Sequence, residues 1–310
     1  MKRPNEFKDP LVWLSSKFKP LRMRDWIEKA CEVNPNVHNK AHLWTPLKLI
    51  CFLYWLEVYT RIIPKYRRRV AYIDLLAGSG TNLIEESGDI ILGSSLLAPL
   101  IYHDKFSQFL FFEVNEEKAA VLEERLRNFE VPNFRIFAQD FNTMDFGILN
   151  EFEHFFIFID SEGLELQWPT IIEFLSREGD LILIFMTQAI ARVLGKAQKE
   201  GESTALTSFM GDESWKEVES AEELLEQYME KLKRYREQYI RRVSYHAYVD
   251  SLQVGGTNFK YHIILVCREG NYTKAWSQLK GKIEGCTERE ASKALKICKG
   301  EIRPLWPSSS

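Results

Sequence analysis

The sequence is poor in the residues that build several common classes of protein. Its 310 residues include only five cysteines, and none of them forms a C-x-x-C pair. This cysteine usage argues against a disulfide framework or a zinc finger and is typical of a reducing cytosol. The longest apolar window, residues 47–56, is too short to span a bilayer and contains Lys48. No signal-peptide pattern is visible at the start, so we expect a cytoplasmic protein without a membrane segment.

The motifs of two large enzyme classes are also missing. There is no G-x-x-x-x-G-K-[ST] loop, which argues against ATP hydrolysis on a phosphate loop. The six histidines are scattered without H-E-x-x-H spacing, so we expect no metal site. The net charge of −3 gives the whole chain no strong attraction to a polyanion.

The charge is nevertheless distributed unevenly along the chain. Residues 1–70 carry 15 Lys and Arg against 6 Asp and Glu, and the remainder therefore carries a net charge of −12. A basic run, Lys65 to Arg69, closes this N-terminal part. Such asymmetry indicates either a nucleic-acid surface or an ordinary solvated helical face.

The most informative stretch is the apolar run Val70 to Leu76, which predicts a central strand buried on both faces. Four small residues follow it, and they are Ala77, Gly78, Ser79 and Gly80. The two glycines predict a tight ligand-binding loop in which the backbone leaves room where side chains would stand. We expect residues 81–86 to open a helix whose free amides face the same crevice.

Two kinds of cofactor suit such a loop. Dinucleotide enzymes use G-x-G-x-x-G, but Leu83 stands here in place of the third glycine. Asp74 stands instead at the end of the strand, four residues before Gly78. A carboxylate in that place repels phosphate but can hold a cationic amino group, such as that of S-adenosyl-L-methionine (SAM). The sequence therefore favours SAM, and an NAD(P)-binding Rossmann protein remains the alternative.

From residue 70 onward apolar strands alternate with helical segments, a pattern that predicts parallel β-α units. The predicted parallel strands are 70–76, 109–114, 134–138, 155–160 and 180–186, with a helix at 115–129. A long charged helix at 214–239 precedes two antiparallel strands at 242–249 and 260–267. We expect an α/β fold with a Rossmann-like, doubly wound, mostly parallel sheet.

The expected organisation has three parts. Residues 1–69 form an N-terminal helical extension whose longest helix runs from Thr45 to about Ile62. Residues 70–270 form the Rossmann-like domain, and residues 271–310 form a C-terminal helical segment and tail.

Acidic residues follow three of the other predicted parallel strands. Doubly wound sheets bind ligands at the carboxyl ends of their strands, so these acids are candidate ligands of a cofactor or substrate. Glu113, after the second strand, is expected to bind both ribose hydroxyls of the cofactor. Asp140, after the third, is expected to accept from the adenine amino group, with Phe141 beside the ring. The alternative for both acids is a helix cap.

The fourth strand ends in Asp160-Ser161-Glu162-Gly163. Asp160 or Glu162 is the candidate general base in a water-poor pocket, and a turn cap is the alternative for Asp160. Enzymes that methylate exocyclic base amines usually carry Asn or Asp, two prolines and an aromatic residue here, and this chain lacks both prolines and the aromatic residue.

With these motifs in order, the chain resembles the three-Cys-motif partner protein family (TcmP), which is similar to class I SAM-dependent methyltransferases. The resemblance covers roughly residues 42–270. The motifs that carry it are His42-x-Trp44 with Lys48-Leu49, Tyr72-Ile73-Asp74 through Ala77-Gly78-x-Gly80, Gly93-Ser94 with Leu96-Leu97, Phe112-Glu113, Phe158-Ile159-Asp160 with Gly163, and Ile184-Phe185 before Thr187. The family tends to have Gly-Ser-Pro and Asp-Pro-Phe-Gly where this chain has Gly93-Ser94-Ser95 and Asp160-Ser161-Glu162-Gly163.

The resemblance implies a class I methyltransferase fold, SAM as the cofactor and a partner protein with a three-cysteine motif, of the radical-SAM-like kind. The expected function is SAM-dependent methyl transfer, with nucleic acid as a candidate acceptor. A non-catalytic partner subunit with the same fold is the alternative that the unusual end of the fourth strand favours.

Overall fold

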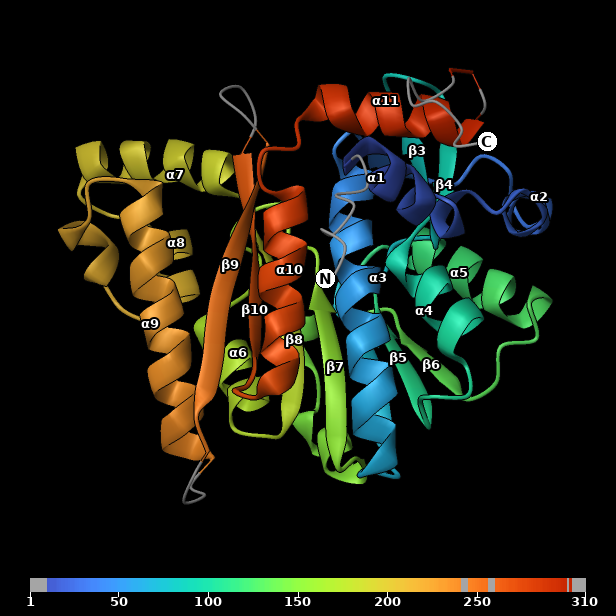
Figure 1. Cartoon of the computed structure of the whole chain (residues 1–310). Coiled ribbons are helices and arrows are strands. Elements are labelled where there is room, and N and C mark those ends of the chain that lie inside the picture. Colours follow the sequence, from blue (N-terminus) through green and yellow to red (C-terminus); the bar gives the residue numbers. More distant parts are fainter. Residues whose placement is uncertain (1–9, 241–244, 256–259, 300, 303–310) are drawn as a thin grey trace, which may run out of the picture.

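The computed structural model describes residues 10–240, 245–255, 260–299 and 301–302. A seven-stranded sheet with the order β6-β5-β2-β7-β8-β10-β9 lies at the centre (Figure 1). The strand bounds are β2 Val70–Asp74, β5 Gln108–Phe112, β6 Phe134–Phe137, β7 His154–Ile159, β8 Gly179–Phe185, β9 Ala247–Gly255 and β10 Lys260–Arg268. The first five strands of the order are parallel, and β10 is antiparallel to both its neighbours. The predicted α/β, doubly wound and mostly parallel sheet is confirmed.

The connections of the sheet reverse direction between β2 and β7. From β2 the chain builds outward through β5 to β6, and it then returns to place β7 on the other side of β2. At such a switch point the loops after two neighbouring strands diverge and leave a crevice at the carboxyl end of the sheet. The antiparallel β10 beside the edge strand β9 is the arrangement that the resemblance to class I methyltransferases implied.

Helices cover both faces of the sheet, and therefore the parallel strands are buried on both sides. Every residue of β7 is buried, with Phe156 and Phe158 on one face and Phe155 and Ile157 on the other. The helices on the first face are α3 Thr45–Ile62, α4 Ser94–Tyr102, α5 Glu116–Asn128 and α10 Lys274–Ile283. Those on the second face are α6 Trp168–Leu175, α7 Thr187–Glu200, α8 Thr204–Met210 and α9 Ala221–Tyr239.

The N-terminal helices pack into the same core as the sheet. Helix α3 has 12 of its 18 residues buried, and Phe52 and Trp55 lie in the cluster that contains Phe156 of β7. The outer helices α1 Pro10–Phe18 and α2 Arg24–Glu32 and the C-terminal helix α11 Glu288–Lys299 extend this layer. The expected N-terminal, central and C-terminal parts of the chain therefore pack together around one sheet. None of the described helices is both long and apolar enough to cross a membrane.

The helix predicted to open at residues 81–86 is wrong. Residues 81–84 form strand β3 (Thr81–Ile84), which pairs in parallel with β1 (Asn39–Ala41) and antiparallel with β4 (Ile90–Leu92). A turn at Gly88, with φ of 70°, joins β3 to β4. Pairing with an N-terminal segment overrides the local preference, and the helix α4 begins only after Gly93.

The second half of the chain also differs from the predicted elements. The helices α7 and α8 lie within residues 187–210, a stretch for which no element is predicted. The charged helix predicted at 214–239 is a 3₁₀ turn, Ser214–Glu217, followed by α9, whose first turn is capped by Ser220. The strand predicted at 242–249 starts at Ala247, and residues 241–244 lie outside the described part.

Candidate functional site

The loop after β2 lies across the carboxyl ends of two neighbouring strands. The Leu75 amide donates to the Phe158 carbonyl of β7 at 3.2 Å, and the Ala77 amide donates to the Phe112 carbonyl of β5 at 2.9 Å. Helix α4 holds the loop from the side, because the Ser95 hydroxyl donates to the Ala77 carbonyl at 2.7 Å. The loop is thus fixed at the switch point of the sheet.

Three further amides of the loop also have acceptors. Leu76 donates to Asp74 Oδ1 at 3.4 Å, Gly78 to Glu113 Oε2 at 2.9 Å, and Ser79 to Asn39 Oδ1 at 3.1 Å. Five consecutive amides, 75–79, are therefore occupied by protein acceptors. A phosphate-binding loop needs free amides and a helix N-terminus, and here a strand follows the loop. This geometry disfavours a pyrophosphate ligand and with it the NAD(P) alternative.

The two glycines of the loop are required by packing. Gly78 and Gly80 have φ of 61° and 90°, which disfavours any residue with a Cβ. A Cβ on Gly78 would lie 2.2 Å from Asn39 Nδ2, and one on Gly80 would lie 2.8 Å from Leu96 Cγ. The expectation that these glycines leave room for a ligand is thus wrong at the Cβ positions, because protein atoms fill that space.

Glu113 is partly exposed at the end of β5 and faces the loop. Its Oε1 accepts from the Asn115 amide at 2.8 Å, and its Oε2 accepts from the Gly78 amide. A carboxylate offers about four lone-pair sites, so each oxygen can accept one more hydrogen bond. The next residue, Val114, is 67% exposed, which places an apolar surface beside this carboxylate.

Asp74 is fully buried and faces the protein. Its carboxyl group accepts from the Tyr72 hydroxyl at 3.0 Å and from the Leu76 amide, and it also bonds the Ser94 side chain. Burial raises the pKa of Asp74 to about 7, the charge of Asp160 acts in the same direction, and these hydrogen bonds oppose the shift. Asp74 joins the loop to helix α4, and contact with a ligand's amino group remains a prediction.

The raised pKa of Asp74 predicts a pH-dependent stability that Asp74→Asn removes. An unfolded Asp has a pKa of about 3.9, so between about pH 4 and pH 7 the native state binds more protons than the unfolded state. Wild-type stability from this group therefore falls as pH rises through that window, by up to about 1.4 kcal/mol per pH unit. In urea unfolding, the free energy of unfolding of Asp74→Asn should rise relative to that of the wild type as the pH increases to about 7. Above that pH the difference between the two proteins should stay constant. A constant difference would mean that Asp74 is ionised in the native state.

Of the two predicted adenine-binding residues after β6, Asp140 lies at the surface and Phe141 lies in the core. Asp140 is exposed and caps a 3₁₀ turn, Phe141–Thr143, by accepting from the Asn142 amide at 2.9 Å. The capping alternative for Asp140 is therefore seen, and its exposure leaves a contact with adenine as a prediction. Phe141 is only 5% exposed and packs in the core, so its ring does not lie open beside the loop.

The end of β7, which carries the candidate general base, forms an ion pair with helix α3. Asp160 Oδ1 accepts from Lys48 Nζ of α3 at 2.6 Å, and the two side chains are 23% and 11% exposed. Ser161 is buried and donates to the Ile184 carbonyl, whereas Glu162 is exposed. Lys48 was assigned no catalytic or binding role from the sequence. It is the one charged residue in the apolar window 47–56, and a lone charge in a buried helix is the signal that indicates a specific partner.

Two further residues that sequence reasoning missed shape the loop. Arg125 of α5 is completely buried and donates to the Ser79 carbonyl at 2.7 Å and to Thr81 Oγ1 at 2.8 Å. Its other donors reach the carbonyls of Ala30, Val33 and Asn34 at the end of α2. The signal for Arg125 is its place on the apolar face of its helix, three residues after Leu122. Asn39, the second missed residue, had no signal, because its role depends on the pairing of β1 with β3.

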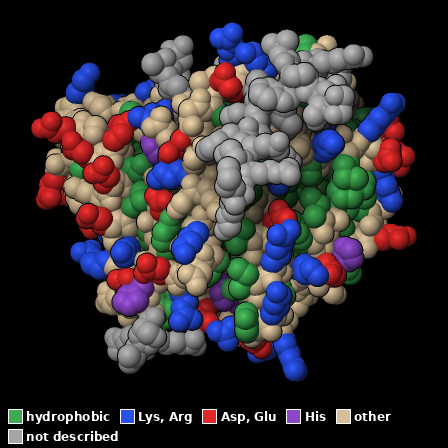
Figure 2. Space-filling model, in the orientation of Figure 1, with side chains coloured by type: hydrophobic (Ala, Val, Ile, Leu, Met, Phe, Trp, Pro, Cys, Tyr) green, Lys and Arg blue, Asp and Glu red, His purple; other side chains and the backbone are tan. Residues whose placement is uncertain are grey.

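The basic run lies at the opposite edge of the sheet from the loop. It directly precedes Val70, the first residue of β2, while the loop follows the last residue of that strand. Arg67 forms an ion pair with Glu178, and Arg69 lies 3.7 Å from Glu153. On the face of the molecule that Figure 2 draws, Lys and Arg are interspersed with Asp and Glu. Two of the four basic side chains of the run are thus paired with local acids.

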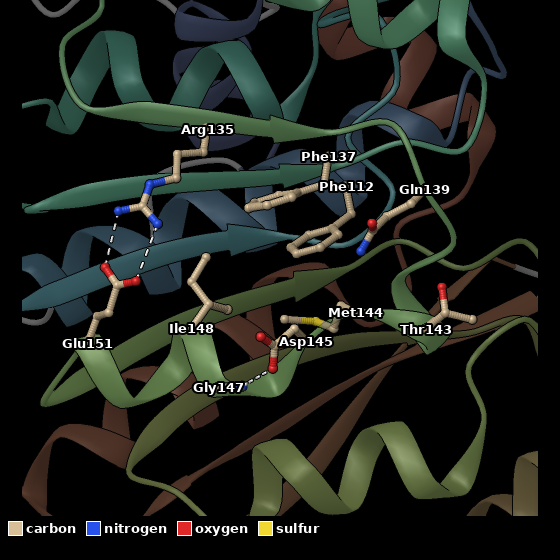
Figure 3. Close-up of a pocket in the computed structure, with 10 residues that line it drawn as sticks. All are labelled: Phe112, Arg135, Phe137, Gln139, Thr143, Met144, Asp145, Gly147, Ile148 and Glu151. Carbon is tan, nitrogen blue, oxygen red and sulfur yellow. Dashed lines mark hydrogen bonds and ion pairs between the residues drawn. The ribbon is translucent and has the colours of Figure 1, made fainter.

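A cavity of about 560 Å³ lies beside the predicted cofactor residues, between β5, β6 and the 3₁₀ segment Phe146–Glu151 (Figure 3). Its lining residues are Phe112, Arg135, Phe137, Gln139, Thr143, Met144, Asp145, Gly147, Ile148 and Glu151. The rings of Phe112 and Phe137 stack at 4.7 Å inside it, and Arg135 pairs with Glu151 at 3.1 Å. The predicted site residues do not line this cavity. No group of three metal-ligating side chains is found within the described ranges.

No known protein family matches the chain, and no curated protein matches it. Among solved structures, an rRNA methylase from Streptococcus thermophilus is 10% identical, with a TM-score of 0.38 over 70% of this chain and 95% of that chain. A precorrin-6y C5,15-methyltransferase from Geobacter metallireducens GS-15 is 14% identical, with a TM-score of 0.38 over 76% and 96%. A ribosomal protein L11 methylase from Lactobacillus delbrueckii subsp. bulgaricus is 10% identical, with a TM-score of 0.35 over 73% and 81%.

These values are low, and the fold assignment rests on the strand order. The order, the antiparallel edge and the loop at the switch point define a chain with the class I methyltransferase fold. The closer resemblance to the three-Cys-motif partner family has no support from the comparisons and stays a proposal.

Proposed function

We propose that this chain is a SAM-dependent methyltransferase. The observation that carries the proposal is Glu113, whose carboxylate lies at the switch point, bonds the Gly78 amide and retains acceptor capacity. A ribose diol presents two hydroxyl donors, and a carboxylate can accept from both. A phosphate group has no such donors to offer this carboxylate. The loop amides at 75–79 already have protein acceptors, so a cofactor without phosphate suits the site better than a dinucleotide.

Each candidate residue has a role in this proposal. Glu113 binds the ribose, the exposed Val114 covers one face of the adenine, and Asp140 accepts from the adenine amino group. The backbone of residues 77–80 borders the methionine part, and Asp74 keeps that backbone in place through its bonds to α4. SAM supplies an electrophilic methyl group on a sulfonium. Asp160 receives the proton that the acceptor loses, with Glu162 as the alternative base.

Glu113→Gln should weaken SAM binding about 10- to 100-fold, because a charge-assisted hydrogen bond contributes about 1.5–3 kcal/mol. The amide also places an N–H group against the Gly78 amide, which costs further affinity. Calorimetric titration with SAM and with S-adenosylhomocysteine measures the effect. Glu117→Gln, at an exposed site on the first turn of α5, is the matched control and should bind as the wild type does.

Titration of the wild type with NAD separates the two cofactor classes. We expect no binding of NAD, because the loop amides of residues 75–79 already have protein acceptors and are not free to bind a pyrophosphate. A folded wild type that binds neither SAM nor S-adenosylhomocysteine at millimolar concentration would refute the SAM proposal.

A non-catalytic partner subunit is the second candidate function, and the departure of residues 160–163 from the family pattern favours it. In that case SAM binds, or the fold alone remains, and a three-Cys-motif protein performs the chemistry. Labelled methyl transfer to RNA, DNA and protein separates the two candidates, since only the methyltransferase transfers label by itself.

Nucleic acid remains a proposed acceptor class, without an assigned surface. The basic run Lys65 to Arg69 first suggested it. The run lies at the far edge of the sheet from Asp160, and two of its arginines lie beside acids. It would therefore not deliver an acceptor to the site by itself.

A further inference from the structure

The ion pair at the end of β7 places a hydrogen-bond donor, the Lys48 ammonium, beside an acceptor, the Asp160 carboxylate. Lys48 Nζ donates to Asp160 Oδ1 at 2.6 Å. Among the described residues, nothing donates to Asp160 Oδ2, and no second acceptor lies at Lys48 Nζ. A lysine ammonium has three donors, so two remain, and the free carboxylate oxygen accepts. The pair therefore presents a donor and an acceptor side by side.

The net charge of the Lys48–Asp160 pair and its surroundings is close to zero. The Lys48 ammonium offsets the Asp160 carboxylate, and both side chains are mostly removed from water. Asp74, at the end of the neighbouring strand, is bonded to Tyr72 and Ser94 and is turned away from solvent. Tyr261 is buried nearby, and its hydroxyl bonds the Trp44 carbonyl at 3.3 Å. An anionic acceptor would add a net negative charge to a pair whose own charges already offset each other.

We propose that the methyl acceptor at this site is a neutral hydroxyl group, held between Lys48 and Asp160. This inference rests on the proposed function. A hydroxyl donates one hydrogen bond and accepts others, so it satisfies Asp160 Oδ2 and Lys48 Nζ together. An aryl amine would leave the lysine donors unmatched, and an ionised carboxylate or phosphate, which only accepts hydrogen bonds, would leave Asp160 Oδ2 without a donor. The departure from the Asn/Asp-Pro-Pro-aromatic pattern of amine-methylating enzymes agrees with this choice.

The reaction balances with these groups alone. The hydroxyl oxygen forms a bond to the methyl carbon, the bond from that carbon to the SAM sulfur breaks, and the sulfur keeps the electron pair. The hydroxyl proton passes to Asp160 Oδ2. Lys48 stabilises the negative charge that develops on the acceptor oxygen, because an ammonium that donates to this oxygen opposes the charge. The products are a methyl ether, S-adenosylhomocysteine and a protonated Asp160.

The test is labelled methyl transfer from SAM to total RNA and, separately, to total protein, followed by mass spectrometry of the hydrolysed product. Both pools contain hydroxyl groups and nitrogen nucleophiles, so the kind of modified atom decides. We expect O-methyl products. Lys48→Met should reduce transfer about 10- to 100-fold, the size of one charge-assisted hydrogen bond, while changing the Kd of SAM less than about threefold. Lys48→Arg should restore part of the activity, because a guanidinium also donates.

Lys196→Met is the matched control, since Lys196 is an exposed lysine of α7 paired with Glu200. N-methyl products would overturn the hydroxyl inference and leave the proposed methyltransferase intact. Equal activity of Lys48→Met and wild type would also overturn it. SAM binding without transfer to either pool would overturn both the inference and the catalytic proposal, whereas absence of SAM binding would refute the proposed function itself.

Discussion

Asp160→Asn should reduce methyl transfer by roughly 10²–10⁴-fold, the usual contribution of a general base, while SAM affinity stays nearly unchanged. The amide preserves the shape of the side chain and can still accept one hydrogen bond, but it cannot take up the acceptor's proton. The ion pair sharpens this expectation, because Lys48 fixes one carboxylate oxygen and leaves the other at the end of a fully buried strand. Steady-state transfer of labelled methyl, with parallel titration of SAM, measures both quantities.

Glu162→Gln is the control for this experiment. Glu162 lies two residues further on and is exposed. If Asp160 is the base, Glu162→Gln should leave transfer within a few-fold of the wild type, and if Glu162 is the base, Glu162→Gln should carry the loss instead. Asp160→Asn also removes the negative charge that the Lys48 ammonium pairs with. The double variant Lys48→Met with Asp160→Asn removes that unpaired charge and shows how much of the loss comes from it. If Asp160 only caps a turn, stability should fall by about 0.5–2 kcal/mol and activity should survive.

Arg125→Met should destabilise the protein by about 3–5 kcal/mol, near the upper end of single-residue effects. The guanidinium is completely buried, and its donors satisfy the carbonyl oxygens of α2 and of the loop. Its removal leaves several buried acceptors without donors, and each costs about 1–3 kcal/mol before relaxation. The last carbonyls of a helix also favour a cation, which the variant loses. Urea unfolding of the whole chain measures the difference.

Arg127→Met is the matched control two residues away. Arg127 is exposed on the same helix and pairs with Glu123, so its replacement should change stability by less than about 0.5 kcal/mol. Arg125→Lys keeps the charge but loses the planar fork of donors, so it should fall between the wild type and Arg125→Met. If Arg125→Met unfolds at the same urea concentration as the wild type, then Arg125 does not clamp the loop. If the Met variant does not fold, Arg125→Lys still gives the test.

The sequence alone determined the central sheet of this protein. The apolar runs at 155–160 and 180–186 lack alternation because both faces of a central parallel strand are covered, and this property is local to each run. The helix from Thr45 to Ile62 was equally predictable, since Pro46 begins it and Pro64 follows it closely. The acids Glu113 and Asp160 were found for the same reason, because each directly follows a run that has to be a strand.

Only the tertiary structure decided what surrounds these acids. Residues 81–84 form a strand because β1, about 40 residues earlier in the chain, pairs with them, and no local preference encodes that partner. The same pairing brings Asn39 onto Gly78, and the packing of α3 on the sheet brings Lys48 to Asp160. Short-range pattern reveals which segments are buried and where they end. The contacts between segments distant in sequence depend on how the buried faces fit together. In this protein those contacts give the acids at the strand ends their hydrogen-bond and ion-pair partners.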